Sequence, residues 1–163
     1  AAHCGRCTAC IEVCPTRAIV APYQLDARLC ISYLTIEHHG AIPVGLRPLL
    51  GNRVFGCDDC QLVCPWNRFA TPTPEHDFLP RHGLDAPALV GLLGWDEATF
   101  LQRTEGSPLR RLGHLRWLRN VAVALGNGPA SDAARDALRA RLAHPSELVR
   151  EHAEWALERL RGA

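Results

Sequence analysis

Apolar residues in the last third of the chain recur at intervals of three and four positions, the spacing of one face of an α-helix. After Ser107 these positions are Leu109, Leu112, Leu115, Leu118, Val121, Ala122 and Leu125. The sequence GNGP at 126–129 cannot continue a helix. The pattern therefore predicts a helix that begins just after Ser107 and ends near residue 126.

Two more helices follow from the same period. Ser131 is suited to cap the first of them, which ends before His144–Pro145, and Ser146 to cap the second. The predicted inward positions are Ala134, Leu138, Leu142, Val149, Ala153, Ala156, Leu157 and Leu160. The pairs 124–125 and 156–157 are both Ala-Leu and lie 32 residues apart. This echo favours a short HEAT-like repeat, with a helical bundle that has no binding role as the alternative.

Upstream of these helices the pattern is weaker. The stretch DAPALVGLLGWDEATFLQRT has short apolar runs that predict one or two helices. Prolines at positions 72, 74 and 80 precede it. We therefore expect residues 71–106 to form a linker with short helices, and residues 107–163 to form the helical repeat.

Cysteine spacing, rather than hydrophobic period, organises the first 70 residues. The run CGRCTACIEVCP has the form C-x2-C-x2-C-x3-C-P, and CDDCQLVCP repeats its end. Cysteines two residues apart make poor disulfide partners, and zinc motifs usually offer two separated pairs. The spacing, the proline and the total of eight cysteines instead indicate the run that holds two [4Fe-4S] clusters in bacterial ferredoxins.

In such a run the fourth cysteine ligates the other cluster. This exchange assigns the first cluster to Cys4, Cys7, Cys10 and Cys64. The spacing would place a further cysteine at position 54, which is valine, and Cys30 is the only cysteine left over. The second cluster is therefore predicted to bind Cys14, Cys30, Cys57 and Cys60.

Composition places the chain among globular proteins, since 47% of its 163 residues are hydrophobic and its net charge is +1. No apolar run approaches the roughly 18 residues that cross a membrane, and no secretory signal precedes the cysteines. The absence of any methionine suggests a piece of a longer protein. Residues 1–102 carry 7 Arg and 10 acids, whereas residues 103–163 carry 11 Arg and 7 acids. This asymmetry hints at a polyanionic partner for the second half.

The segments CISYLTIE, GAIP and LRPLLGNRVFGCDDCQLVCPWN closely resemble the epoxyqueuosine reductase family. The resemblance is specific from Cys4 to about Asn67 and looser toward the C-terminus. It implies an α+β, mostly helical chain, with a bacterial ferredoxin-like two-[4Fe-4S] domain at residues 1–70 followed by the HEAT-like repeat. In that family a cobalamin-binding catalytic domain precedes the cluster domain, and this chain lacks it.

The resemblance also implies a reaction. The family removes the epoxide oxygen from a modified base at the tRNA wobble position, which consumes two electrons and two protons, and the clusters relay electrons to a corrinoid cofactor. The cobalamin-contacting residues carried over are Ser32, Tyr33, Cys57 and Asp58, with local capping or packing as the alternative for the first two. No catalytic acid is assigned in this chain, which we expect to be inactive alone.

For the tRNA partner the resemblance favours the arginines on the first helix of the tail, Arg110, Arg111, Arg116 and Arg119, as contacts to the anticodon stem-loop backbone. A solvated outer helix face is the alternative. The pair His38–His39 replaces a less polar residue and a lysine of the family pattern, and we expect both to be solvent-exposed or near the substrate.

Further expectations are a flavodoxin or ferredoxin system as electron donor, a monomeric state, no membrane association and a cytoplasmic location. Two other functions fit the clusters: a ferredoxin-type electron carrier, and the iron–sulfur domain of another corrinoid enzyme such as a reductive dehalogenase. The long insertion after Cys30 and the arginine-rich tail argue against the carrier, and the family segments argue against the dehalogenase.

Overall fold

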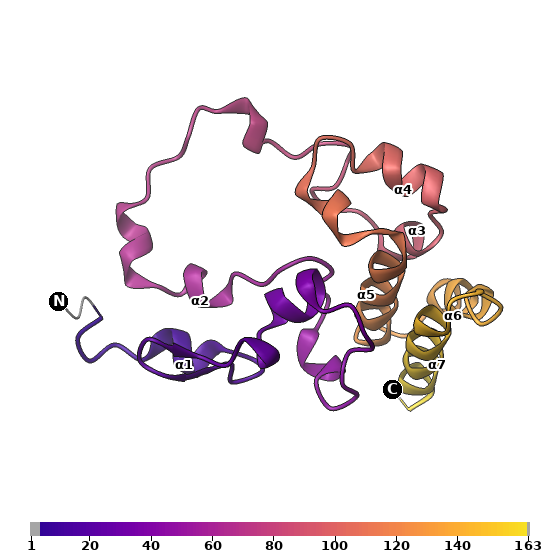
Figure 1. The fold of residues 1–163 in the computed structure, drawn as a ribbon, viewed down its shortest axis with the longest axis horizontal. Helices are drawn as coiled ribbons and strands as arrows, with labels where there is room; N and C mark the ends of the chain where they lie inside the picture. The colour runs from indigo at the N-terminus through magenta and orange to yellow at the C-terminus, as the bar shows by residue number, and fades with distance from the viewer. Residues whose placement is uncertain (1–3, 163) are drawn as a thin grey trace.

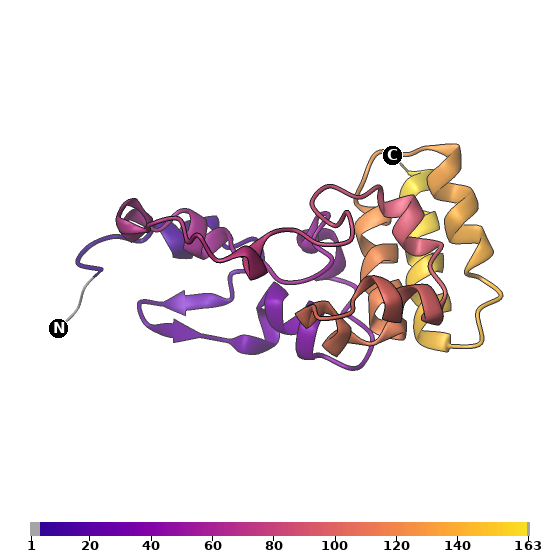
Figure 2. The ribbon, with the colours of Figure 1, turned by 90° about the horizontal axis from the view of Figure 1, so that it is seen from above.

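The computed structural model describes residues 4–162, so the first three residues of the predicted cluster domain lie outside it. The N-terminal part, with the cysteines, forms an elongated arm at one end of the molecule (Figure 1). The helices of the C-terminal part stand side by side at the other end (Figure 2). About half of the described residues are helical, and the sheet that they contain is a single two-stranded hairpin, which the sequence did not predict.

The cysteine-bearing arm is built from short elements. Its two strands pair antiparallel through Ile19 and Leu25. The elements in order are α1 (Ala9–Val13), β1 (Ile19–Ala21), β2 (Gln24–Leu25), η1 (Ala27–Leu29), η2 (Tyr33–Glu37, a π-helical turn), η3 (Arg47–Leu50), α2 (Asp59–Leu62) and η4 (Pro65–Phe69). Among these elements only η2 and η3 contain buried residues, so the apolar core of the arm lies near them.

The helical part holds the main hydrophobic core, with Phe100, Trp117 and Leu118 among its largest buried side chains. Its elements are α3 (Leu89–Leu93), α4 (Glu97–Arg103), η6 (Pro108–Leu112), α5 (His114–Gly126), α6 (Asp132–Ala140) and α7 (Glu147–Arg161). The middle segment thus contains two helices, and both contribute buried residues to this core. The extended stretch with the prolines, which includes only η5 (His76–Phe78), arches from η4 to α3 (Figure 1).

The first helix of the tail starts later than its apolar pattern predicts. Gly113 has a φ of 73°, a left-handed conformation that ends η6 and lets α5 begin at His114. This break shifts the helix face, so Leu112 and Leu118 are buried whereas Leu115 is 47% exposed. The helix ends at Gly126 as predicted.

The two later helices follow the prediction closely. The Ser131 hydroxyl caps α6 by accepting a hydrogen bond from the Ala134 amide at 3.2 Å. Ser146 occupies the N-cap position of α7, but its side chain makes no capping bond. The predicted inward residues of α7 are all buried, whereas Leu142 lies beyond the end of α6 and is exposed.

Helices α5 and α7 lie close together at the end of α5. A Cβ atom on Gly126 would lie 2.8 Å from the Ala156 Cα atom, so no larger residue fits there. Both alanine-leucine pairs of the sequence echo are buried.

Within residues 4–162, each helix is too short or too polar to span a lipid bilayer.

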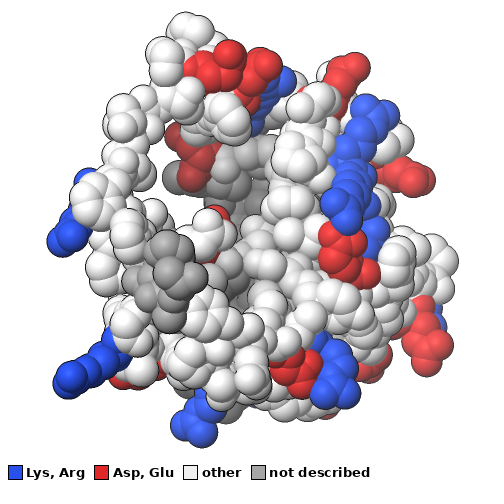
Figure 3. All heavy atoms as spheres, turned by 60° about the vertical axis from the view of Figure 1, so that its left-hand side comes forward, with Lys and Arg blue, Asp and Glu red and all other residues white. Residues whose placement is uncertain are grey.

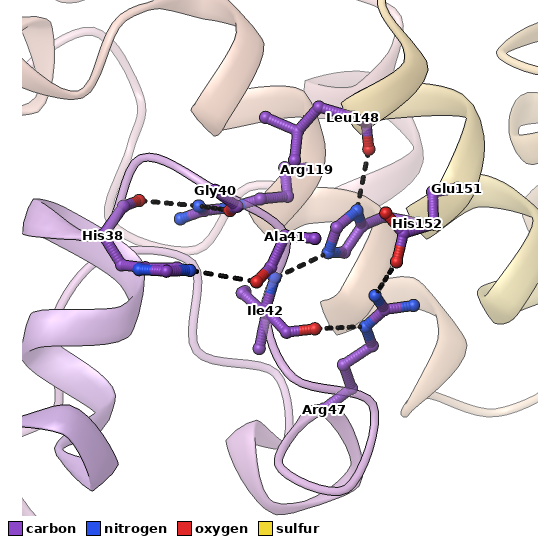
Figure 4. Close-up of polar contacts among 9 residues, drawn as sticks. All are labelled: His38, Gly40, Ala41, Ile42, Arg47, Arg119, Leu148, Glu151 and His152. Carbon is purple, nitrogen blue, oxygen red and sulfur yellow. Dashed lines mark hydrogen bonds and ion pairs between the residues drawn. The ribbon is translucent and has the colours of Figure 1, made fainter.

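Within the arm, the insertion between Cys30 and Cys57 packs against the helical part. Its Ile31, Leu34, Ile42 and Leu50 form a second apolar cluster with Val123 of α5. Polar groups on α5 and α7 reach into the same insertion (Figure 4). Arg47, which is buried, donates to the Ile42 carbonyl at 2.8 Å and forms an ion pair with Glu151.

His152 on α7 is one of these polar groups and is fully buried (Figure 4). Its Nε2 atom accepts a hydrogen bond from the Ile42 amide at 3.1 Å, so Nδ1 carries the proton and donates to the Leu148 carbonyl at 2.7 Å. Burial, with the positive charges of Arg47 and Arg119, lowers the pKa of His152 to about 4, while Glu151 opposes the shift. Protonation would break the bond to Ile42.

We therefore expect stability to fall in mild acid. The unfolded chain binds a proton at His152 near the ordinary pKa of about 6.5, above the folded value, so the free energy of unfolding decreases as the pH falls between these values. From pH 7 to pH 5 the loss attributable to His152 is about 2 kcal/mol. Urea denaturation of the parent and of His152→Gln at both pH values measures it. An equal decrease in both proteins would contradict the assignment.

Candidate metal centre

Four cysteines meet at a cavity of about 240 Å³ at the outer end of the arm. They are Cys4, Cys7, Cys10 and Cys64, the set assigned to the first cluster. Trp66 and Phe69 of η4 lie at the same cavity and are 54% and 62% exposed. Figure 3 turns this side of the molecule toward the viewer: uncharged atoms fill most of the face, and most charged side chains lie toward its edge.

A second cavity of about 340 Å³ lies next to the first. The second set, Cys14, Cys30, Cys57 and Cys60, lines it. Cys4 and Cys10 border both cavities, so the two sets are neighbours. Val54 is not part of this lining; it packs against the main hydrophobic core instead. The structure thus brings Cys30, and not residue 54, to the second cavity.

All eight cysteines are free thiols. In the part of the chain that the structure describes, no three His, Cys, Asp or Glu side chains converge as ligands of a single metal ion would. Each set of four instead surrounds a space, and thiolates around a space fit a cubane cluster, whose iron atoms each take one cysteine.

Cys14 lies just after α1 in an environment that favours the thiolate. Its sulfur accepts a hydrogen bond from the Ala18 amide at 3.2 Å and lies 3.8 Å from the Thr16 hydroxyl. Burial alone would raise the pKa of the Cys14 thiol, but the amides of Ile19 and Ala18 and the Thr16 hydroxyl hold it below its usual value. The loop before β1 therefore prepares this cysteine as a metal ligand.

A pair of charged residues lies at the second cavity, near Cys57 and Cys60. Asp59 lines the cavity and forms an ion pair with Arg53, and burial raises the pKa of the Cys57 thiol. Asp58 is exposed at the N-cap position of α2, where its carboxylate accepts a hydrogen bond from the Gln61 side chain at 3.0 Å.

Of the residues assigned to cobalamin, Ser32 makes local contacts within the chain. Its hydroxyl accepts a hydrogen bond from the Cys57 amide at 2.9 Å and lies 3.2 Å from the Cys57 carbonyl oxygen, to which it donates. It therefore holds together the segments that carry Cys30 and Cys57. The neighbouring Tyr33 is partly exposed, and its ring lies 6.1 Å from that of His38.

The predicted arginine surface needs a correction, because Arg119 is fully buried (Figure 4). Its guanidinium donates to the carbonyls of Leu34, His38 and Gly40 at 2.7–2.8 Å. Burial and the nearby Arg116 charge lower its pKa to about 10, which leaves it charged at neutral pH. A residue whose guanidinium is fully buried and bonded to backbone carbonyls is unable to contact a nucleic acid.

The other three arginines differ in their surroundings. Arg110 and Arg111 are exposed, and Arg111 forms an ion pair with Glu37. Arg116 is half-buried and donates to the Ile36 carbonyl at 2.7 Å and to the Arg111 carbonyl at 2.9 Å. The accessible part of the predicted surface is therefore Arg110 and Arg111, with Arg116 beside them.

The two histidines of the pair His38–His39 differ in their exposure to solvent. His39 is exposed as expected, whereas His38 is half-buried, with Nε2 2.9 Å from the Ala41 carbonyl. Residues that the sequence did not single out include Asn120, Thr35 and His152, all fully buried and hydrogen-bonded. For Asn120 the sequence offers one indication of a buried polar role, because Arg119 and Asn120 form a polar pair between apolar neighbours.

Comparison with known proteins agrees with this geometry. The family described as "4Fe-4S double cluster binding domain" matches residues 3–67. The epoxyqueuosine reductase of Pseudomonas aeruginosa is 68% identical over 157 residues, covering 96% of this chain and 44% of that protein. The Escherichia coli epoxyqueuosine reductase is 60% identical, covering 94% of this chain and 40% of that protein. The chain therefore spans less than half the length of these relatives.

Solved structures give the same result for the fold. A crystal structure of selenomethionine-labelled epoxyqueuosine reductase superposes with a TM-score of 0.89 at 33% identity, covering 96% of this chain and 42% of that one. An epoxyqueuosine reductase crystallised with an epoxyqueuosine-modified tRNA-Tyr stem loop gives a TM-score of 0.82 at 31% identity, with the same coverage. Throughout the part of its relatives that it spans, the chain belongs to the epoxyqueuosine reductase family.

Proposed function

We propose that this chain is the iron–sulfur and tRNA-binding part of an enzyme that reduces epoxyqueuosine to queuosine in tRNA. The observation that carries the proposal is the pair of adjacent cavities, each lined by one of the two predicted sets of four cysteines. The high identity to epoxyqueuosine reductases over nearly the whole chain supports it.

The two sets of cysteines would hold the two clusters, each of which stores a single electron when bound. Because Cys4 and Cys10 border both cavities, the chain keeps the two sites adjacent, as an electron relay requires. Removal of the epoxide oxygen consumes two electrons, which matches two one-electron centres. The electron donor in this proposal is a flavodoxin or ferredoxin system.

Corrinoid contact belongs to the same proposal. Tyr33 and Asp58 are exposed and stand close in sequence to Cys30 and Cys57 respectively, and Ser32 and Cys57 complete the predicted contact set. The contacts of Ser32 with Cys57 support a role in shaping that surface. The remaining cobalamin contacts and the proton donor would lie in the part of the relatives that this chain does not span.

We propose a division of the chain into a cluster part at residues 1–70, a connecting part at 71–106 and a HEAT-like helical part at 107–163. The contact of α5 with α7 across Gly126 and Ala156, with α6 between them in the sequence, supports the repeat. The complete protein is proposed to act as a monomer in the cytoplasm.

The tRNA part of the proposal predicts a salt-dependent loss of affinity. In the complete protein, Arg110→Ala with Arg111→Ala removes two exposed cations, so affinity for an epoxyqueuosine-modified stem loop should fall about tenfold near 0.1 M salt. The dependence of log Kd on log salt should become shallower by up to about two. Fluorescence anisotropy over a salt series measures both quantities.

Arg139→Ala is the matched control, since Arg139 is also exposed and paired with an acid, but on α6 outside the predicted surface. It should leave affinity and salt slope unchanged. An unaltered slope in the double variant would remove this surface from the proposal. Failure of the complete parent protein to convert the epoxyqueuosine of the stem loop, followed by mass spectrometry, would overturn the proposed function itself.

A further inference from the structure

Two segments that are distant in sequence meet at the second cavity. Residues 31–35 directly follow Cys30, and residues 54–57 lead to Cys57, with 26 residues between the two cysteines. A loop of this length does not by itself fix the distance between its ends. Side chains that bridge the two segments must therefore set the relative position of these two ligands.

Thr35 provides one bridge. Its buried hydroxyl donates to the Ile31 carbonyl at 2.7 Å and accepts a hydrogen bond from the Gly56 amide at 3.0 Å. Together with Ser32, which binds the Cys57 amide, it fastens the turn after Cys30 to the residues just before and at Cys57.

Asn120 on α5 provides the second bridge, from outside the cluster arm. Its Nδ2 atom donates to the carbonyls of Thr35 and Val54, both at 2.8 Å, and its Oδ1 atom accepts from Arg119 at 2.9 Å. The side chain is fully buried, and both of its amide hydrogens are used. The Asn120 amide group thus holds both segments. One of the two carbonyls that it binds belongs to Val54, the position at which the cysteine spacing predicts a cysteine.

From this geometry we propose that Asn120 is a positioning residue for the second cluster. It sets the separation between the segments that carry Cys30 and Cys57. Helix α5 therefore positions the ligands of the second cluster, although it provides none of these ligands itself. The helical part then has a role in cluster retention as well as in tRNA binding. This inference rests on the proposed assignment of Cys30 and Cys57 to one cluster.

The test uses Asn120→Asp in the complete protein, purified without oxygen. The two side chains have the same shape, but a carboxylate oxygen would replace the amide nitrogen and face two carbonyl oxygens, which repels both segments. Asn127→Asp is the matched control. Asn127 occupies the C-cap position of the same helix and donates in the same way to the carbonyls of Arg47 and Gly51, at 2.8 and 3.0 Å, neither of which is next to a cysteine in sequence.

Iron and sulfide analysis and electron paramagnetic resonance of the reduced proteins are the readouts, with thermal denaturation beside them. We expect Asn120→Asp to fall from about eight irons per chain to about four, with one of two cluster signals lost. Asn127→Asp should keep about eight irons and the parent spectrum, even if its melting temperature falls as much as that of Asn120→Asp. Parent-like iron and spectrum in Asn120→Asp, or an equal cluster loss in both variants, would overturn the proposal.

A second pair of variants decides the case if Asn120→Asp does not fold. Thr35→Val removes the bridging hydroxyl at nearly constant shape, whereas Thr35→Ser keeps it. Loss of the second cluster in the valine variant and its retention in the serine variant would support the bridge, and equal retention would overturn it. A parent with one cluster, or with zinc, would instead show that the ligand assignment fails, and this inference with it.

Discussion

Replacement of Cys30 by alanine should reduce the iron content of the complete protein from about eight atoms per chain to about four. The second cavity would then be lined by only three cysteines of its set, Cys14, Cys57 and Cys60, because the others at its border belong to the first cavity. A cubane with an unligated iron is labile, so the second cluster should be lost or damaged. Anaerobic iron and sulfide analysis measures the loss.

The same experiment distinguishes sequence spacing from tertiary placement. In Cys30→Ala combined with Val54→Cys, the ferredoxin spacing is restored, yet we expect no recovery of iron. Val54 packs against the helical core, and its carbonyl is bound by Asn120, so a thiol at position 54 would point away from the second cavity. Eight irons in Cys30→Ala, or full recovery in the double variant, would show that the second ligand set is wrong.

Replacement of Arg119 by methionine should lower the free energy of unfolding by about 3–5 kcal/mol. Methionine matches the length of the aliphatic stem but donates no hydrogen bond. The carbonyls of Leu34, His38 and Gly40 would be left buried without their donor, and each costs about 1–3 kcal/mol. Urea denaturation of the parent and the variant measures the difference.

Arg111→Met is the control for this prediction. Arg111 lies on the same stretch of chain, but its ion pair with Glu37 is exposed, so its loss should cost less than about 1 kcal/mol. Equal destabilisation by the two substitutions would contradict the role given to Arg119. A large effect at Arg119 alone would confirm that this arginine supports the insertion rather than the nucleic-acid surface.

Where the sequence was sufficient, the signal was short in range. Cysteine spacing within a run reflects how a tight loop can surround a cluster, so the two sets of cysteines could be proposed from spacing and count, and the structure brings each set to one cavity. Likewise, the inward residues of α7 and the capping role of Ser131 follow from the helical period and from local backbone bonding.

Prediction failed where a side chain's partner lies far away in sequence. Arg119 was taken for a surface residue because charge usually indicates solvent, but its partners are backbone carbonyls about 80 residues upstream. The sequence predicts too early a start for α5 because the helical spacing of apolar residues continues through η6. Only the left-handed backbone of Gly113 separates η6 from α5.

The sequence alone indicated the two candidate sets of cysteine ligands, where the main helices of the tail lie and which family the chain resembles, because these depend on residue type and local spacing. Only the tertiary structure decided that the insertion is held by buried polar groups of α5 and α7, and that Val54 turns to the core while Cys30 turns to the second cavity. The physical reason is that a buried carbonyl must find a donor, and the sequence does not state which distant side chain will provide it.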